Sequence, residues 1–200
     1  MCIRDSIYYA SPKLVALKRQ KQLGLYNDLF REELYMMEER PAGNAEHMDN
    51  FGNSKKIISY LDLLDIRTES NEALIDQPWT VRTRIFDLFI HDWDRHDDQF
   101  RWAQFEVDGD EVYRPIPRDR DQAFYKFNGL IPKFLNRQFL KNFIDFGDDL
   151  KRGDNFTLNS AFFDRYFLNE LEWKEWENEI SFLQKNLTDE VIENAAINYQ

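Results

Sequence analysis

The sequence RWAQFEV occupies residues 101–107, DGD residues 108–110 and EVYRPIP residues 111–117. Polar and apolar residues alternate in both outer runs, which is the pattern of a half-buried strand. The Asp-Gly pair between them favours a tight hairpin turn, because both residue types tolerate the left-handed backbone that such a turn needs. Pro115 and Pro117 have no backbone N–H, so they confine the end of the second strand to an edge or to the exit from the sheet. The stretch therefore predicts a β-hairpin.

Most of the remaining chain carries helical patterns. Ser54 is expected to cap a helix that runs to about Leu64, and Thr80 is expected to cap one that ends near Ile90. A strand is predicted at 33–40, and a loop with a short helical turn at 65–79. Further helices are predicted at about 130–145, 159–169, 172–186 and 188–197. The predicted fold class is α+β and mainly helical, with the helices arranged around the hairpin.

Composition excludes several classes of function. The chain has 200 residues with 26 Lys and Arg and 37 Asp and Glu, a formal charge of −11, which argues against nonspecific nucleic-acid binding and against docking on anionic lipid. Its single cysteine, Cys2, excludes a disulfide framework and a cysteine-based zinc site. No apolar run approaches the ~18 residues that would predict a membrane span. Aromatic residues make up 16% of the chain, enough to fill a core.

The first six residues, MCIRDS, contain no apolar segment of the kind found in signal peptides. They resemble a leader that appears when sequencing-adapter DNA is translated in assembled environmental data. We therefore expect the native chain to begin further upstream and Cys2 not to be native. The last residues, Asn198-Tyr199-Gln200, carry no terminating signal, so we expect the chain to continue there as well.

Ionisable residues are concentrated in two segments. The first contains Asp92, Asp94, His96, Asp97 and Asp98 and directly follows the apolar helix that ends near residue 90. The second contains Asp119 and Asp121 and directly follows the hairpin. Because a hairpin returns the chain to where it started, the two segments are predicted to face each other.

Such a concentration of carboxylates needs a counter-charge, since two of them at ~4 Å repel by roughly 4 kcal/mol at an effective dielectric near 20. Four arginines could supply it by forming a solvated salt-bridge cluster, namely Arg95, Arg101, Arg118 and Arg120. A bound divalent cation could supply it as well. Oxygen ligands with no thiol and few imidazoles favour Mg²⁺ or Mn²⁺ over Zn²⁺.

The order of these parts resembles the C-terminal lobe of atypical, protein-kinase-like enzymes: the spore-coat CotH-type, Golgi secretory, HipA-type and phosphoinositide kinases. Asp94-Arg95-His96 resembles their catalytic-loop Asp-Arg-His. Residues 115–124, PIPRDRDQAF, resemble the Pro-x-Asp-x-Asp-x-x-Phe stretch of CotH-type proteins. The same region, with Arg84-Ile85-Phe86-Asp87, is also similar to a group of bacterial envelope proteins, some of them fused to outer-membrane barrels.

The resemblance implies a role for each matching residue. Asp94 matches the catalytic aspartate, which orients the acceptor hydroxyl and accepts its proton. His96 matches the motif histidine that braces the loop. Asp119 matches the metal-binding aspartate, with Asp121 as an alternative or second ligand. Gln99 stands where these families place a second metal ligand, often Asn, so Asp98 is an alternative for that role.

The resemblance also implies two lobes, Mg²⁺ or Mn²⁺, and ATP. Residues 1–45 would be the remnant of an N-terminal lobe with its hinge strand, in which Glu38 contacts the nucleotide. Residues 46–200 would form the helical catalytic lobe. The phosphate-gripping lysine has no convincing counterpart, so this piece alone is expected to be a poor enzyme. The phosphoacceptor is left open. The envelope group implies a location in the cell envelope or periplasm, with the cytoplasm as the alternative, and fusion to or association with an outer-membrane protein.

Two other functions fit parts of the sequence. A non-catalytic pseudokinase or envelope scaffold is favoured by Gln99 and by the missing lysine. An HD-type metal phosphohydrolase would need His47, His91-Asp92 and Asp119 in one site, and it would leave Asp94-Arg95-His96 without a role.

Overall fold

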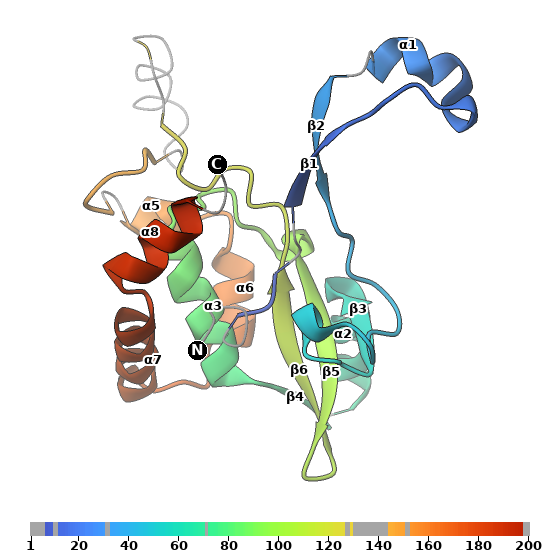
Figure 1. Cartoon of the computed structure of the whole chain (residues 1–200). Coiled ribbons are helices and arrows are strands. Elements are labelled where there is room, and N and C mark those ends of the chain that lie inside the picture. The colour runs from blue at the N-terminus through green and yellow to red at the C-terminus, as the bar shows by residue number, and fades with distance from the viewer. Residues whose placement is uncertain are drawn as a thin grey trace.

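The computed structural model describes residues 7–9, 12–30, 33–70, 72–126, 129, 144–150 and 153–197. Its strands are β1 (Pro12–Ala16), β2 (Leu34–Glu38), β3 (Lys56–Ser59), β4 (Ala73–Ile75), β5 (Phe100–Val107) and β6 (Asp110–Pro117). Its α-helices are α1 (Asn27–Phe30), α2 (Tyr60–Glu69), α3 (Gln77–Phe89), α5 (Gly153–Phe156), α6 (Ala161–Phe167), α7 (Trp173–Asn186) and α8 (Asp189–Ile197). Short 3₁₀ segments are η2 (Lys21–Tyr26), η3 (Asp49–Phe51) and η4 (Asp97–Gln99). The fold is α+β, with more residues in helices than in strands, as predicted (Figure 1).

The predicted hairpin is confirmed. Strands β5 and β6 pair antiparallel from Phe100 opposite Pro117 to Val107 opposite Asp110. Asp108 and Gly109 both have positive φ angles, 54° and 96°, which is the backbone that an Asp-Gly hairpin turn requires. The open end of the hairpin therefore lies at residues 100 and 117, where both acidic segments join it.

The hairpin forms the centre of a four-stranded sheet with the order β3-β5-β6-β4. Strand β3 is antiparallel to β5, and β4 is parallel to β6. Aromatic side chains of α6 cover one face, where the rings of Phe100 and Phe163 lie 4.0 Å apart and those of Trp102 and Phe167 lie 4.6 Å apart. This packing holds the base of the hairpin in a buried core.

The helix expected from Ser54 to Leu64 is wrong in its first half. The chain first forms β3, and helix α2 begins at Tyr60. Ile57 and Ile58 are both buried but belong to separate clusters, because consecutive residues of a strand point to opposite faces of the sheet. The N-cap is Ser59, whose Oγ accepts a 3.1 Å hydrogen bond from the backbone N–H of Asp62.

The loop expected at 65–79 is also wrong, because α2 continues to Glu69, β4 follows, and α3 begins at Gln77. The N-cap of α3 is Asp76, whose Oδ1 accepts a 3.0 Å hydrogen bond from the backbone N–H of Trp79. Thr80, the expected cap, is buried and donates its hydroxyl to the Asp76 carbonyl at 2.7 Å. An aspartate two residues before Pro78 was thus the better capping signal.

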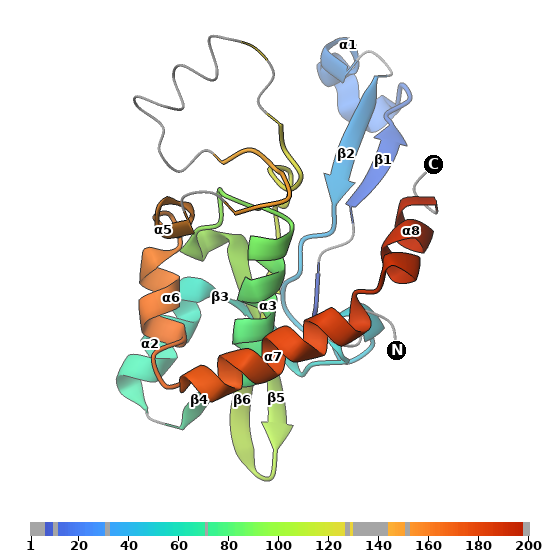
Figure 2. The same ribbon diagram turned by 90° about the vertical axis from the view of Figure 1, so that its left-hand side faces the viewer.

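Helices α6, α7 and α8 confirm three of the predicted segments, at 159–169, 172–186 and 188–197. Figure 2 shows α7 crossing α3, and the Arg82 guanidinium joins the Glu179 carboxylate at 2.6 Å between them. The helix predicted at 130–145 lies outside the described residues except for its last two, which are not helical. Among the residues with assigned positions, no helix is long and apolar enough to cross a bilayer.

The strand predicted at 33–40 is confirmed as β2, which pairs antiparallel with β1. Figures 1 and 2 show that β1, β2 and α1 form an arm that extends away from the four-stranded sheet. The end of β2 at Glu38 points back towards the hairpin. This arrangement brings the amino-terminal part of the chain to the open end of the hairpin.

Candidate functional site

The loop after α3 and the segment after β6 bring three carboxylates into one electrostatic neighbourhood. Burial raises the pKa of Asp94, and the carboxylates of Asp121 and Asp119 raise it further, whereas His96 and Asn159 oppose the shift. The Asn159 amide donates a 3.1 Å hydrogen bond to Asp94 Oδ1. Asp119 and Asp121 are exposed, whereas Asp94 is partly buried. The two acidic segments identified in the sequence therefore meet at the open end of the hairpin.

Glu38 reaches the same place from β2. Its Oε1 accepts a 2.9 Å hydrogen bond from the backbone N–H of Asp119, which has a left-handed φ of 55°. Burial raises the pKa of Glu38, and the Asp119 carboxylate raises it further, although the hydrogen bond opposes this. The arm thus holds the backbone of Asp119 in place.

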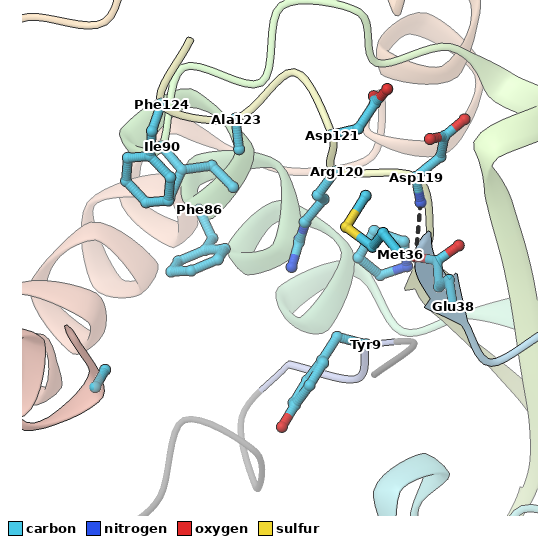
Figure 3. Close-up of a pocket in the computed structure, with 12 residues that line it drawn as sticks. Tyr9, Met36, Glu38, Phe86, Ile90, Asp119, Arg120, Asp121, Ala123 and Phe124 are labelled. Carbon is cyan, nitrogen blue, oxygen red and sulfur yellow. Dashed lines mark hydrogen bonds between the residues drawn. The ribbon is translucent and has the colours of Figure 1, made fainter. Parts of the chain in front are cut away.

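A cavity of about 630 Å³ opens beside these carboxylates (Figure 3). Figure 3 shows Glu38, Asp119 and Asp121 on one side of it and the apolar side chains of Phe86, Ile90 and Phe124 on the other. Its lining consists of Tyr9, Met36, Glu38, Phe86, Ile90, Pro117, Asp119, Arg120, Asp121, Ala123, Phe124 and Ala195. Apolar walls with a few polar groups at one end are typical of sites for small molecules.

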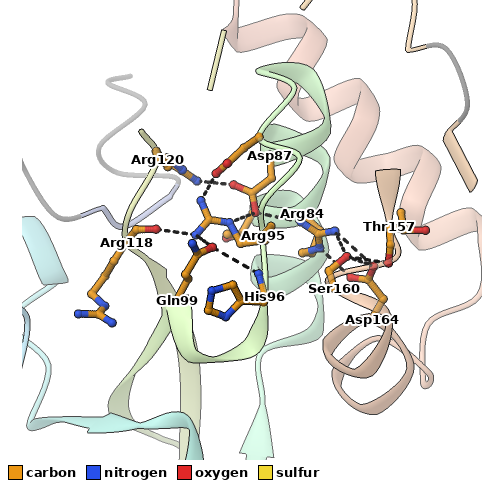
Figure 4. A network of polar contacts seen from close by, with 12 residues as sticks. Arg84, Asp87, Arg95, His96, Gln99, Arg118, Arg120, Thr157, Ser160 and Asp164 are labelled. Carbon is orange, nitrogen blue, oxygen red and sulfur yellow. Dashed lines mark hydrogen bonds and ion pairs between the residues drawn. The ribbon is translucent and has the colours of Figure 1, made fainter. Parts of the chain in front are cut away.

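A buried ion-pair network lies beneath the carboxylates, with Asp87 of α3 at its centre (Figure 4). Asp87 accepts from Arg84 at 3.1 Å and from Arg120 at 2.8 Å, and it pairs with Arg95 Nε at 3.3 Å. Although burial opposes ionisation, Arg95, Arg120 and Arg84 together hold the pKa of Asp87 below its usual value. We call this group of one aspartate and three arginines the Asp87 hub.

Arg95 connects the hub to the residues that flank both strands at the open end of the hairpin. Its guanidinium donates to the Arg118 carbonyl at 2.5 Å, to the Gln99 side-chain oxygen at 3.2 Å and to Asp92 Oδ2. Because Arg95 adjoins Asp94 and Arg118 adjoins Asp119, these bonds set how far apart the two aspartates lie. The four arginines were expected to form a solvated cluster, but Arg95 is buried.

Asp92 is the second buried carboxylate that contacts Arg95. Burial raises its pKa to about 6, and Asp87 adds to the shift, whereas Arg95 and Arg120 oppose it. Its Oδ1 is buried and has no hydrogen-bond partner among the described residues. The environment of Asp92 therefore disfavours its charge.

Arg84 connects the hub to α6. Its Nε donates to Asp164 at 2.7 Å, and its Nη2 donates to the Ser160 hydroxyl at 2.7 Å. Burial opposes ionisation, but Asp164 and Asp87 raise the pKa of Arg84 above its usual value. Ser160 adjoins Asn159, so the hub also positions the amide that holds Asp94.

The remaining predicted site residues lie at different depths. His96 is exposed, and its backbone N–H donates to the Gln99 side-chain oxygen at 3.3 Å. Gln99 is buried, and its oxygen therefore accepts from both Arg95 and His96. Asp98 is exposed, with a carboxylate oxygen 3.8 Å from Arg101. Gln99 thus braces the loop in this conformation and does not face the cavity.

The parts of the chain that the structure describes contain no group of three or more His, Cys, Asp or Glu side chains placed to hold a metal ion. An HD-type phosphohydrolase would draw on His47, His91, Asp92 and Asp119, and two of these residues have other partners here. His91 is buried, with Nδ1 3.2 Å from the Asp145 carbonyl. Asp92 is paired with Arg95.

No family model, curated protein or solved structure matches this chain. The function must therefore be inferred from the geometry of the site.

Sequence reasoning missed two residues that shape the site. Asp87 is a buried acid between the apolar residues Phe86 and Leu88, and a charge inside an apolar helix could have marked it as a network residue. Asn159 lies 65 positions from Asp94 and belongs to no motif, so no local signal could have placed it there.

Proposed function

We propose that this chain is the catalytic lobe of a kinase-like phosphotransferase that uses a divalent cation and ATP. The observation that best supports the proposal is that Asp119 and Asp121 line a cavity of about 630 Å³ and interact electrostatically with Asp94, which lies outside the lining. Phosphoryl transfer asks a protein mainly to position the reactants and to neutralise charge. An acidic group next to an apolar cavity suits a nucleotide whose phosphates carry a cation.

Asp94 is the residue proposed to orient the acceptor hydroxyl and to accept its proton. A raised pKa makes a carboxylate a better base, as long as it stays ionised at the working pH. The 3.1 Å hydrogen bond from Asn159 to Oδ1 restricts the rotation of the carboxylate and leaves Oδ2 for the acceptor. His96, in this proposal, braces the loop through its backbone contact with Gln99.

Asp119 and Asp121 are the residues proposed to hold the cation. Two carboxylates from the protein are what Mg²⁺ or Mn²⁺ typically uses when substrate phosphates complete its coordination. The exposed positions of both side chains at the cavity fit such a ligand set. The cation would neutralise charge on the phosphates.

The base of the nucleotide would lie against Phe86, Ile90 and Phe124, with Glu38 at the hinge end. Glu38 already contacts Asp119, so the hinge and the cation ligands are parts of one structure. Association with an outer-membrane protein rests on the resemblance alone and stays a prediction.

A non-catalytic nucleotide-binding scaffold is the second candidate, and one observation favours it. The oxygen of Gln99, which stands at the second metal-ligand position, is buried and accepts from Arg95 and His96. Arg120 is the one cation among the described residues that line the cavity, and it is paired with Asp87. Both candidates predict nucleotide binding, and only the first predicts transfer.

The test is a thermal-shift titration of the chain with ATP and Mg²⁺, together and separately. A ligand that binds only the folded state must raise the unfolding midpoint. We expect a rise with both present, its loss in Asp119→Asn and its retention in Asp94→Asn. Asp110→Asn, at the far end of the hairpin, is the matched control. An equal rise in Asp119→Asn would contradict the cation assignment, and no rise in the unaltered chain would overturn the proposal.

A further inference from the structure

Arg101 and Arg118 meet at the open end of the hairpin, and Arg40 lies near enough for its charge to act on Arg101. Arg101 is the second residue of β5, Arg118 follows β6, and Arg40 follows β2. Arg101 Nη1 and Arg118 Nη2 both donate to the Asp98 carbonyl, at 3.4 Å and 3.1 Å. Figure 4 shows the Arg118 side chain pointing away from the hub, while its carbonyl faces Arg95. One carbonyl therefore holds two guanidinium groups together.

The surroundings of Arg101 are unfavourable to its charge. Burial lowers the pKa of Arg101, and both Arg118 and Arg40 lower it further, whereas Asp98 and Asp62 oppose the shift. The nearest of these carboxylates, Asp98, is 3.8 Å from Arg101 and its side chain is 79% exposed. Asp62 is already engaged with Ser59 at the N-cap of α2. An added anion would relieve the repulsion among the arginines.

Guanidinium groups bind oxyanions through paired N–H donors, which makes arginine clusters suited to phosphate and carboxylate. A cluster of arginines is not expected by chance in a chain whose net charge is −11. None of the three arginines lines the cavity proposed for the nucleotide. Yet Arg118 immediately precedes Asp119, so the cluster adjoins the proposed reaction centre from outside the cavity.

We propose that Arg40, Arg101 and Arg118 bind an oxyanion of the acceptor substrate, so that the acceptor is a phosphorylated or carboxylate-bearing molecule. That the bound anion belongs to an acceptor substrate rests on the proposed phosphotransferase function. The anion site itself does not depend on that function. Guanidinium groups recognise phosphate and carboxylate oxygens in the same way. Separate phosphate and carboxylate probes therefore distinguish the two kinds of acceptor.

The test follows the arginine Nε–H signals of the ¹⁵N-labelled chain by NMR while inorganic phosphate or succinate is added without nucleotide or metal. We expect saturable shifts with at least one probe. Arg118→Gln and Arg101→Gln should weaken binding by about tenfold, as for loss of a charge-assisted hydrogen bond. Arg40→Gln removes an exposed side chain and keeps the test valid if a β5 variant fails to fold. Arg19→Gln, on the arm and 65% exposed, is the matched control.

A second titration separates this inference from the proposed function. Binding of the probe in the presence of saturating ATP and Mg²⁺ supports an acceptor site, and displacement of the probe by ATP overturns it in favour of a nucleotide-phosphate site. Binding of the probe by a chain that does not bind ATP supports the anion site and overturns the phosphotransferase proposal. No binding of either probe, or equal binding by all variants, overturns the anion site.

Discussion

The backbone N–H of Asp119 donates a 2.9 Å hydrogen bond to the carboxylate of Glu38, a residue 81 positions earlier in the chain. This bond joins the arm to the segment that follows the hairpin. It also supports a left-handed backbone at Asp119, which a residue other than glycine seldom adopts. The position of the proposed cation ligand thus depends on a side chain of the arm.

Glu38→Ala is therefore expected to weaken the binding of ATP with Mg²⁺, since it removes the acceptor that holds Asp119. Glu38→Gln keeps an acceptor oxygen at the same distance along the side chain, and we expect it to retain most of the binding. The measurement is the ligand-induced rise of the unfolding midpoint. Equal losses in the two variants would show that the charge of Glu38, and not its hydrogen bond, matters.

Asp87→Asn is expected to lower the free energy of unfolding by about 3–5 kcal/mol, the range for removing one partner of a buried ion pair. The three arginines of the Asp87 hub would lose their shared counter-charge, and two of them, Arg84 and Arg95, are almost completely buried. Urea denaturation measures the change, with Asp110→Asn as the control. A loss below about 1 kcal/mol, the typical scale for an exposed ion pair, would contradict the central role of the hub.

Asp92 predicts a pH dependence of stability. Its pKa is raised to about 6 in the folded chain, from the ordinary value of 3.8. A raised pKa stabilises the fold at low pH, and this contribution is lost as the pH rises through about 6. Asp92→Asn cannot titrate, so its stability relative to the unaltered chain should improve between pH values of about 4 and 7.

The measurement for Asp92 is urea denaturation of both proteins at about four pH values across that interval. The comparison cancels the titration of carboxylates that do not interact with Asp92, and Asp87, which does interact with it, is kept ionised by its three arginines. A difference that stays constant with pH would show that Asp92 is ionised in the folded chain throughout.

Asn159→Ala is expected to raise the pKa of Asp94 further, because the hydrogen bond from Asn159 is one of the contacts that oppose the existing rise. Carboxyl ¹³C NMR titration of the labelled chain measures the pKa directly. Asn44→Ala, in an exposed turn, provides the control. An unchanged pKa would mean that the Asn159 amide does not hold the Asp94 carboxylate in solution.

Local sequence patterns predicted the elements that position the site. The Asp-Gly turn and its two alternating runs gave the hairpin within one residue at either end, and apolar spacing gave the three helices after residue 159. The same reasoning failed at 54–64, where Ile57 and Ile58 suit either a helix or a strand. Pairing of β3 with β5 decided between them, and that contact is non-local.

The sequence by itself determined that two acidic segments flank a hairpin, because turn chemistry and side-chain alternation act between near neighbours. Only the tertiary structure decided which groups hold these carboxylates in place. Arg120 joins Asp87 across 33 positions and Asn159 joins Asp94 across 65, and the packing of α3 and α6 against the sheet brings them together. Burial then determines which charges are stable, since a buried carboxylate needs partners that no local pattern can supply.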